Sequence, residues 1–214
     1  MVSNKKFSSS RLDYFKNKFF TNKTKDEISF YIEKIGEESD QINMSQGVSI
    51  PSESMYKNLF AEFGDNICDN QAKEIYDNLE ILFLKYPPIP MYDLEELKNI
   101  LNTLRSMGVS TNISSNTAYI KGETLIKVFQ QFDYIDNFDF YIFSDQINSS
   151  KPSNIFFKNL ESKCKNIGVS KNNIIHIGDS LEADIEGANA YGIKSKLIDP
   201  INKDLILFLR NYRN

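Results

Sequence analysis

Two carboxylates in the C-terminal part of the chain have the spacing expected of a cation site. An apolar run at residues 174–177 ends in Gly178 and Asp179, and Asp184 follows five positions later. A strand that turns at Gly-Asp into a helix brings both carboxylates toward one small volume. Carboxylate oxygens are preferred ligands of hard divalent cations such as Mg2+. The sequence therefore predicts a metal site at Asp179 and Asp184.

Three further polar residues stand where a parallel sheet binds its ligands. Ser115 and Asn116 follow a predicted strand at 109–114, and Lys151 comes just before a predicted helix. Ligands of parallel sheets bind at the carboxyl ends of the strands. A hydroxyl, an ammonium and two carboxylates together suit a phosphate ester bound with Mg2+. We expect the Ser115 hydroxyl and the Asn116 backbone to donate to phosphoryl oxygens, and Lys151 to neutralise their charge.

Each of these residues also has a simpler structural interpretation. Asp179 could cap a helix, Ser115 could be a turn residue, and Lys151 could be a solvated side chain. Their order and their positions after strands agree with one another, so we interpret them as one site. His176, the only histidine of the chain, is expected to pack in or near this site rather than to act in catalysis.

The elements that must position these residues fall into two blocks. Residues 24–85 are predicted to be all-helical, with a capping box at 24–27 and helices at 24–38, from Pro51 and from Asn70. Three prolines within 86–90 end this block. Residues 86–214 then alternate between predicted helices and strands, an arrangement typical of a parallel sheet covered on both faces. These are helices at 93–107, 122–132, 153–167 and 181–191, and strands at 109–114, 138–143, 174–177 and 196–198.

Composition limits the possible functions. With 214 residues and 41% hydrophobic content the chain can bury a core, and its net charge of −4 argues against nucleic-acid binding. No apolar run approaches the ~18 residues that span a bilayer, so we expect a cytoplasmic protein without a membrane partner. The basic segment 1–23 is expected to be a solvated surface segment, and the alternative is an arm that binds a polyanion.

Over residues 86–199 the chain resembles the haloacid dehalogenase-like (HAD) superfamily. Residues 113–117 (ISSNT) resemble its second motif, residues 144–156 its third and residues 178–192 its fourth. The resemblance implies a parallel Rossmann-like core sheet with an inserted helical cap at 24–85. It also implies a Mg2+-dependent phosphatase of a small phosphorylated metabolite. In this family Ser115 and Lys151 would serve catalysis and phosphate binding, with Asp179 and Asp184 as metal-binding acids. Dehalogenation fits the metal-binding acids less well.

The first motif of the superfamily is absent from this sequence. These enzymes attack phosphorus with an Asp at the end of the first strand, in the pattern Asp-x-Asp-x-Thr after an apolar run. Nothing before residue 24 fits, because Asp13 lacks both the preceding apolar strand and the second Asp. Without that nucleophile no aspartyl-phosphate intermediate can form. In the fold that the chain resembles, this first core strand lies between the strands that end at Ser115 and Asp179.

A missing inner strand would leave backbone groups of its two neighbours unpaired. The two neighbours could close on each other, another segment could fill the gap, or the protein could begin upstream of Met1, which is the interpretation we favour.

Two functional hypotheses follow. The first is a phosphatase whose N-terminal strand is absent from the sequence. The second is a catalytically silent HAD-like module that binds a phosphorylated ligand or a protein partner.

Overall fold

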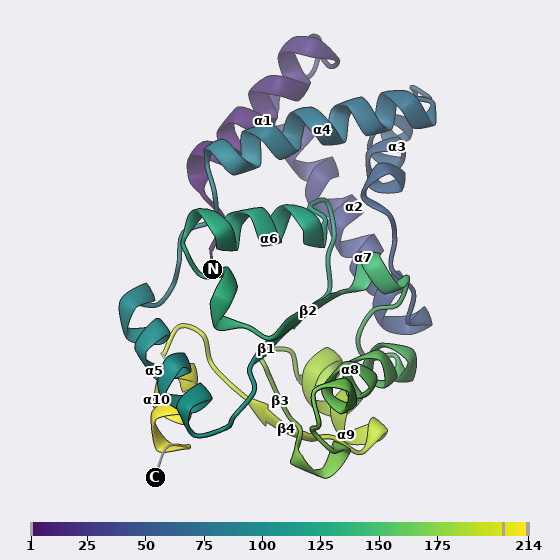
Figure 1. Cartoon of the computed structure of the whole chain (residues 1–214). Helices are drawn as coiled ribbons and strands as arrows, with labels where there is room; N and C mark the ends of the chain where they lie inside the picture. The colour runs from purple at the N-terminus through teal and green to yellow at the C-terminus, as the bar shows by residue number, and fades with distance from the viewer. Residues whose placement is uncertain (1, 203, 213–214) are drawn as a thin grey trace.

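The computed structural model describes residues 2–202 and 204–212, which form a helical block joined to a region of alternating helices and short strands (Figure 1). In chain order the elements are α1 (Lys5–Lys18), α2 (Lys25–Gln46), α3 (Ser52–Glu62), α4 (Asp69–Lys85), α5 (Leu94–Ser106), β1 (Asn112–Ser115), α6 (Gly122–Gln131), η1 (Ile135–Asn137), β2 (Phe140–Phe143), α7 (Ser144–Ile147), α8 (Asn154–Asn166), η2 (Lys171–Asn173), β3 (Ile175–Gly178), η3 (Leu181–Glu186), α9 (Gly187–Tyr191), β4 (Lys194–Leu197) and α10 (Asp204–Asn211).

The helical block consists of α1 to α4, at the top of Figure 1. Helix α2 begins with the expected capping box, in which Thr24 Oγ1 accepts from the Glu27 backbone at 3.1 Å and Glu27 Oε2 accepts from the Thr24 backbone at 2.8 Å. It ends at Gly47, whose φ of 68° favours glycine. One apolar cluster fills the block, and its buried members are Phe15, Phe20, Ile28, Ile32, Tyr56, Leu59, Phe60, Ile75, Tyr76 and Leu79.

The N-terminal segment differs from the solvated surface segment that its charge predicts. It forms α1, which begins at an Asn4 cap and packs against α2 and α4. Phe15 and Phe20 lie in the same apolar cluster as the rest of the helical block. The physical reason is the helical period, which collects the aromatic side chains on one face while the lysines stay toward solvent. The basic segment is therefore part of the helical block.

The strands form two separate parallel pairs among the described residues. Strand β1 pairs with β2, with Ser115 opposite Phe143, and β3 pairs with β4, with Gly178 opposite Leu197. The α/β class with parallel strands is thus confirmed, whereas one continuous sheet does not form in this part of the chain. Among the described residues, β1 in the first pair and β3 in the second pair each have one edge without a strand partner.

Apolar side chains anchor each strand pair to its covering helices. The cluster around β2 and β3 joins α8 and α9, with Phe156 and Phe157 fully buried. A second cluster joins α5 to α10 around Leu104 and Ile206, in the lower left of Figure 1. Throughout residues 2–202 and 204–212, each helix is too short or too polar to traverse a bilayer.

Hydrogen bonds hold the helical block over the carboxyl end of β1. Ser52 Oγ donates to the Ala118 carbonyl at 2.7 Å, and the Tyr56 hydroxyl donates to the Tyr119 carbonyl at 3.2 Å. Ala118 and Tyr119 belong to the loop that follows Ser115. The helices therefore cover the edge where the sequence places its polar residues.

Candidate functional site

The centre of the site is a buried ion pair between Lys151 and Asp184. Lys151 is 7% exposed and Asp184 is 4% exposed, and Nζ lies 2.6 Å from Oδ1. The same ammonium donates to the Ser114 carbonyl of β1 at 3.3 Å. Since Asp184 lies against the end of β3, Lys151 connects the carboxyl ends of two strands that belong to different pairs.

The carboxylate of Asp184 is held by two further groups. His176 Nε2 lies 2.8 Å from Oδ1, and the Ser180 backbone donates to Oδ2 at 3.1 Å. Gly178 makes room for this side chain, because a Cβ there would stand 2.1 Å from Asp184 Cγ. Burial alone raises the pKa of Asp184, but the hydrogen bond from His176 and the charge of Lys151 outweigh it. The pKa therefore lies well below its ordinary value.

A reciprocal pair of hydrogen bonds joins Asn116 to Lys151. The Lys151 backbone donates to Asn116 Oδ1 at 2.8 Å, and Asn116 Nδ2 donates to the Lys151 carbonyl at 3.0 Å. Ser115 Oγ donates to the Asn116 carbonyl at 2.9 Å. The structure thus brings together four of the predicted residues, which are Ser115, Asn116, Lys151 and Asp184.

Asp179 is placed differently from the other predicted residues. Its carboxylate is exposed and takes part in none of the ion pairs of the described residues. Within residues 2–202 and 204–212, no group of three or more His, Cys, Asp or Glu side chains could hold a metal ion. Asp184 already accepts from Lys151, His176 and Ser180. The described residues therefore fit a magnesium site only in part.

A second network fixes the loop after β1, and its side chains lie in the second and third motifs but are not among the predicted site residues. Thr117 Oγ1 donates to Asp145 Oδ1 at 2.9 Å, and the Thr117 backbone donates to Ser144 Oγ at 2.9 Å. The Gly122 backbone donates to the same Asp145 carboxylate at 3.2 Å. The signal available in the sequence was Ser144-Asp145 just ahead of Lys151. This network holds Thr117, the residue that directly follows Ser115 and Asn116 in the chain.

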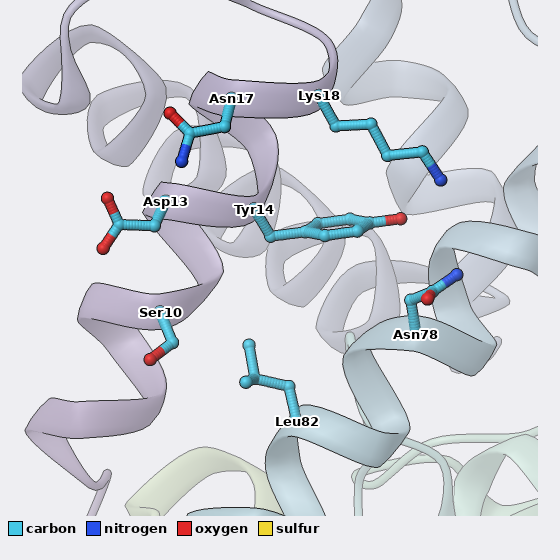
Figure 2. Close-up of a pocket in the computed structure, with 7 residues that line it drawn as sticks. All are labelled: Ser10, Asp13, Tyr14, Asn17, Lys18, Asn78 and Leu82. Atoms are coloured by element: carbon cyan, nitrogen blue, oxygen red, sulfur yellow. The ribbon is translucent and has the colours of Figure 1, made fainter.

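Two surface hollows lie away from the ion pair. One, of about 440 Å³, is formed by α1 and α4, with Tyr14 reaching across toward Asn78 and Leu82 (Figure 2). The other, of about 340 Å³, is lined by residues that include Ser52, Lys121 and Asp145. Neither hollow includes Ser115 or Asp179 in its lining, so neither marks the predicted site.

Comparison with known proteins gives a match to a family model and to a curated protein. Residues 4–198 match the family model described as haloacid dehalogenase-like hydrolase. A ribulose-1,5-bisphosphate 5-phosphatase from Halopiger xanaduensis is 29% identical over 109 residues, which are 49% of this chain and 41% of that protein. The chain therefore spans less than half the length of that curated relative.

Solved structures share the fold at low sequence identity. A HAD-hydrolase, YfnB from Bacillus subtilis, bound to magnesium, gives a TM-score of 0.67 at 14% identity and covers 95% of this chain and 91% of its own. A 2-haloacid dehalogenase from Pseudomonas syringae gives 0.59 at 14% identity, over 92% and 79%. A HAD phosphatase from Thermococcus onnurineus gives 0.57 at 20% identity, over 90% and 77%. Since the family model spans most of its length, this chain belongs to the haloacid dehalogenase-like hydrolase family.

Proposed function

We propose that this protein is the main part of a Mg2+-dependent phosphatase that hydrolyses a phosphomonoester of a small metabolite. We further propose that its nucleophilic Asp lies on a strand outside residues 1–214. The observation that carries the proposal is that the Lys151 ammonium joins the Ser114 carbonyl, next to Ser115 at the carboxyl end of β1, to Asp184 at the end of β3. A hydroxyl and an ammonium are groups that bind and neutralise a phosphoryl oxygen.

Each residue has a defined task in this proposal. The Ser115 hydroxyl and the Asn116 backbone donate to phosphoryl oxygens, and Lys151 supplies a fixed positive charge. Asp179 is the accessible metal-binding carboxylate, while Asp184 holds Lys151 in place through the 2.6 Å ion pair. Mg2+, when bound, would neutralise further charge on the phosphoryl group. The full ligand set then requires an oxygen from outside the described residues, which the nucleophilic Asp would supply.

The strand pairing supports the position of this outside strand. Within the part of the chain that the structure describes, strands β1 and β3 each have one edge without a strand partner, and Lys151 links their ends. A parallel strand inserted between them would pair both edges and bring its last residues to Lys151 and Asp179. The resemblance to the superfamily implies the same place for the nucleophile.

A second candidate is a catalytically silent module that binds a phosphorylated ligand or a protein partner. The carboxylate nearest to the Lys151 ammonium is that of Asp184, and it is fully engaged by protein donors. It is therefore unsuited to attack phosphorus. Dehalogenation ranks below both candidates, because Ser115, Lys151 and the two acids suit phosphate chemistry.

The experiment compares two polypeptides in Mg2+-dependent release of p-nitrophenol from p-nitrophenyl phosphate. One is the 214-residue chain, and the other is extended by the codons read upstream of Met1. We expect turnover by the extended chain, its loss by about 1,000-fold or more in Asp179→Asn, and no turnover by residues 1–214. A sugar phosphate is the natural substrate class to test next, given the similarity to a ribulose-1,5-bisphosphate 5-phosphatase.

Two results would overturn parts of this proposal. Robust turnover by residues 1–214, abolished by Asp179→Asn, would mean that the nucleophile lies within the chain. A stop codon directly upstream of Met1, with no turnover by the 214-residue chain, would favour the silent module. Activity that remains in the Ser115→Ala variant measures contaminating phosphatase, because this variant lacks the proposed phosphate-binding hydroxyl but keeps Asp179.

A further inference from the structure

The C-terminal end of α2 lies against the turn that carries Lys151. The Gly47 carbonyl accepts from the Ser149 hydroxyl at 3.0 Å and from the Ser150 backbone at 3.1 Å. Ser149 is 1% exposed and Ser150 is 0% exposed, so water does not compete for these two bonds. Because Lys151 is the next residue of the chain, the bonds fix the backbone from which its ammonium reaches the Ser114 carbonyl.

This contact is close enough to require glycine at position 47. A Cβ on Gly47 would stand 2.7 Å from Ser153 Cβ and 3.0 Å from Ser153 Oγ, so any other residue would have to displace the turn at residues 149–153. Gly64, which follows α3, has a similar φ of 82°, but no described atom lies within 4 Å of the place of its Cβ. The two glycines share a backbone conformation, and Gly47 differs by touching the turn of Lys151.

The turn at residues 149–153 depends on contacts made by its neighbours. Asn116 bonds to the Lys151 backbone from the loop after β1, and Gly47 bonds to the turn from the end of α2. The Ser150 hydroxyl is buried and makes no hydrogen bond to any described residue. Since a buried hydroxyl without a partner costs free energy, the bonds to Gly47 and Asn116 have to offset that cost.

The same loop of the helical block also reaches the loop after β1. Ser49 Oγ donates to Ser144 Oγ at 3.0 Å, and Ser144 Oγ accepts from the Thr117 backbone at 2.9 Å. Thr117 directly follows the predicted phosphate ligands of that loop. Residues 47–49 therefore contact both segments that carry predicted phosphate ligands.

Helix α2 joins this contact to the core of the helical block. Ile28 and Ile32, near its N-terminal end, lie in the apolar cluster of the block. The helix has 22 residues and is about 33 Å long at ~1.5 Å per residue. It runs from the helical block toward α7 and α8 (Figure 1). A regular helix is stiff, so the place of the Gly47 carbonyl follows from the packing of the block.

We propose that Gly47 and Ser149 are positioning residues for the phosphate site. The carbonyl at the end of α2 keeps Lys151 at the carboxyl end of β1, and binding of a phosphoryl group therefore depends on this contact with the helical block. The assignment rests on the proposed function for the identity of the anion. The hold on Lys151 itself can be measured without any ligand.

The first test measures how fast Lys151 reacts with the acetylating reagent sulfo-NHS acetate in the 214-residue chain, by mass spectrometry of its peptides. We expect Gly47→Ala to speed acetylation of Lys151 by about 10-fold or more, because the new Cβ displaces the turn. Ser149→Ala, which removes one hydrogen bond, should speed it by about 2- to 10-fold. Gly64→Ala is the matched control and should leave the rate unchanged, because it has the same change of φ preference without the contact.

A second substitution should reverse the effect of the first. Ser153→Gly removes the Cβ that the new side chain at position 47 would meet. Ser153 is the N-cap of α8, where glycine replaces serine at little cost. We expect Gly47→Ala/Ser153→Gly to return the acetylation rate of Lys151 to within about 2-fold of Ser153→Gly alone. A general loss of stability would not be reversed in this way.

The second test is calorimetric titration of the same variants with inorganic phosphate. We expect Gly47→Ala to bind phosphate about 10-fold more weakly than Gly64→Ala while melting at a similar temperature. Unchanged Lys151 acetylation in both Gly47→Ala and Ser149→Ala would overturn the proposal. An equal rise at Lys98, whose side chain is 17% exposed in α5, would also overturn it, because that would indicate general loosening.

The two readouts separate this inference from the proposed function. If the wild type binds no phosphate but Lys151 acetylation follows the expected order, the hold of α2 on Lys151 is supported and the proposed function is contradicted. If phosphate binds with equal affinity to Gly47→Ala and Gly64→Ala, the phosphate site does not depend on the end of α2 and the proposal is wrong.

Discussion

The helical block and the strand region of this protein differ in what they bury. The helical block buries mainly apolar side chains in one cluster, with Phe15, Ile28 and Leu59 fully inaccessible. The strand region buries Lys151, Asp184 and His176 between two strand pairs that share no backbone ladder. The helical block therefore has an apolar core of its own. The strand region concentrates charge at one point, the carboxyl ends of β1 and β3, where stability depends on polar partners.

We place the proposed function in the strand region. A buried charge is tolerated only with partners, and here the partners come from different elements: Lys151 precedes α8, Ser114 lies on β1 and Asp184 lies in η3. Such a cluster contributes little net stability, and groups with strongly shifted pKa values often lie at functional sites. In the proposed function the helical block covers the site, and the strand region carries the residues that bind the phosphoryl group.

The largest expected effect comes from breaking the buried ion pair. Asp184→Asn leaves the Lys151 ammonium without its counter-charge and should lower the free energy of unfolding by about 3–5 kcal/mol in urea denaturation. Lys73→Met is the control, because its pair with Asp77 is exposed and is expected to contribute less than about 1 kcal/mol. Similar losses in both variants would contradict the contrast between the two regions.

A cavity in the helical block should cost nearly as much. Leu59 is 0% exposed, so Leu59→Ala removes buried methyl groups and should cost about 2–5 kcal/mol. Ile81 is 68% exposed, and Ile81→Ala should change stability by no more than about 0.5 kcal/mol. If the two variants unfold at the same urea concentration, the helical block is not the packed unit described above.

Loss of the Asn116 side chain should have a smaller effect. Asn116→Ala removes both hydrogen bonds to the Lys151 backbone, at 2.8 and 3.0 Å, and should cost about 1–3 kcal/mol. Asn159→Ala, which removes an exposed bond to the Ile155 carbonyl, is the matched control. A cost for Asn116→Ala no greater than that of the control would show that the loop is held by other contacts.

The smallest expected effect is a pH dependence at the contact between α4 and α6. Burial raises the pKa of Glu80, but hydrogen bonds from Lys127 and Thr124 outweigh it and lower the pKa below its ordinary value. Its stabilisation is therefore present above the unfolded pKa of about 4.3 and is lost as pH falls through the folded pKa. Chemical denaturation between pH 6 and about pH 3 should show a steeper loss for the wild type than for Glu80→Gln, by less than about 1 kcal/mol. Parallel curves would contradict this.

Local sequence signals predicted most helices and strands, but they did not predict how the strands pair or which side chains bond to one another. The capping box at Thr24 and the alternation after residue 90 predicted helices and strands that the structure contains. The helix at Lys5–Lys18 was missed because its lysines outweighed the spacing of its aromatic residues. The sequence interpretation also expected His176 only to pack, whereas it bonds to Asp184 as well. The alternation along a strand indicates the face on which the His176 side chain lies. Its hydrogen bond to Asp184, eight residues later, depends on how the turn between the two residues folds.

The convergence of Ser115, Asn116 and Lys151 followed from their positions relative to strands, because parallel strands present their carboxyl ends together. The engagement of Asp184 could not be predicted in the same way. Its ion pair spans 33 residues, and both oxygens are shared among donors that only the packed structure brings together. The pairing of strands into two sheets is likewise a long-range property, which short apolar runs do not encode individually.

Backbone amide exchange, measured residue by residue in the 214-residue chain, tests whether the strand edges are unpaired. We expect amides on the unpaired edges of β1 and β3 to exchange more than about 100-fold faster than those in the buried turns of α2 and α3. Protection of β1 and β3 equal to that of the helical block would contradict it. Such protection would mean that the two strand pairs are already complete and that the site needs no further strand.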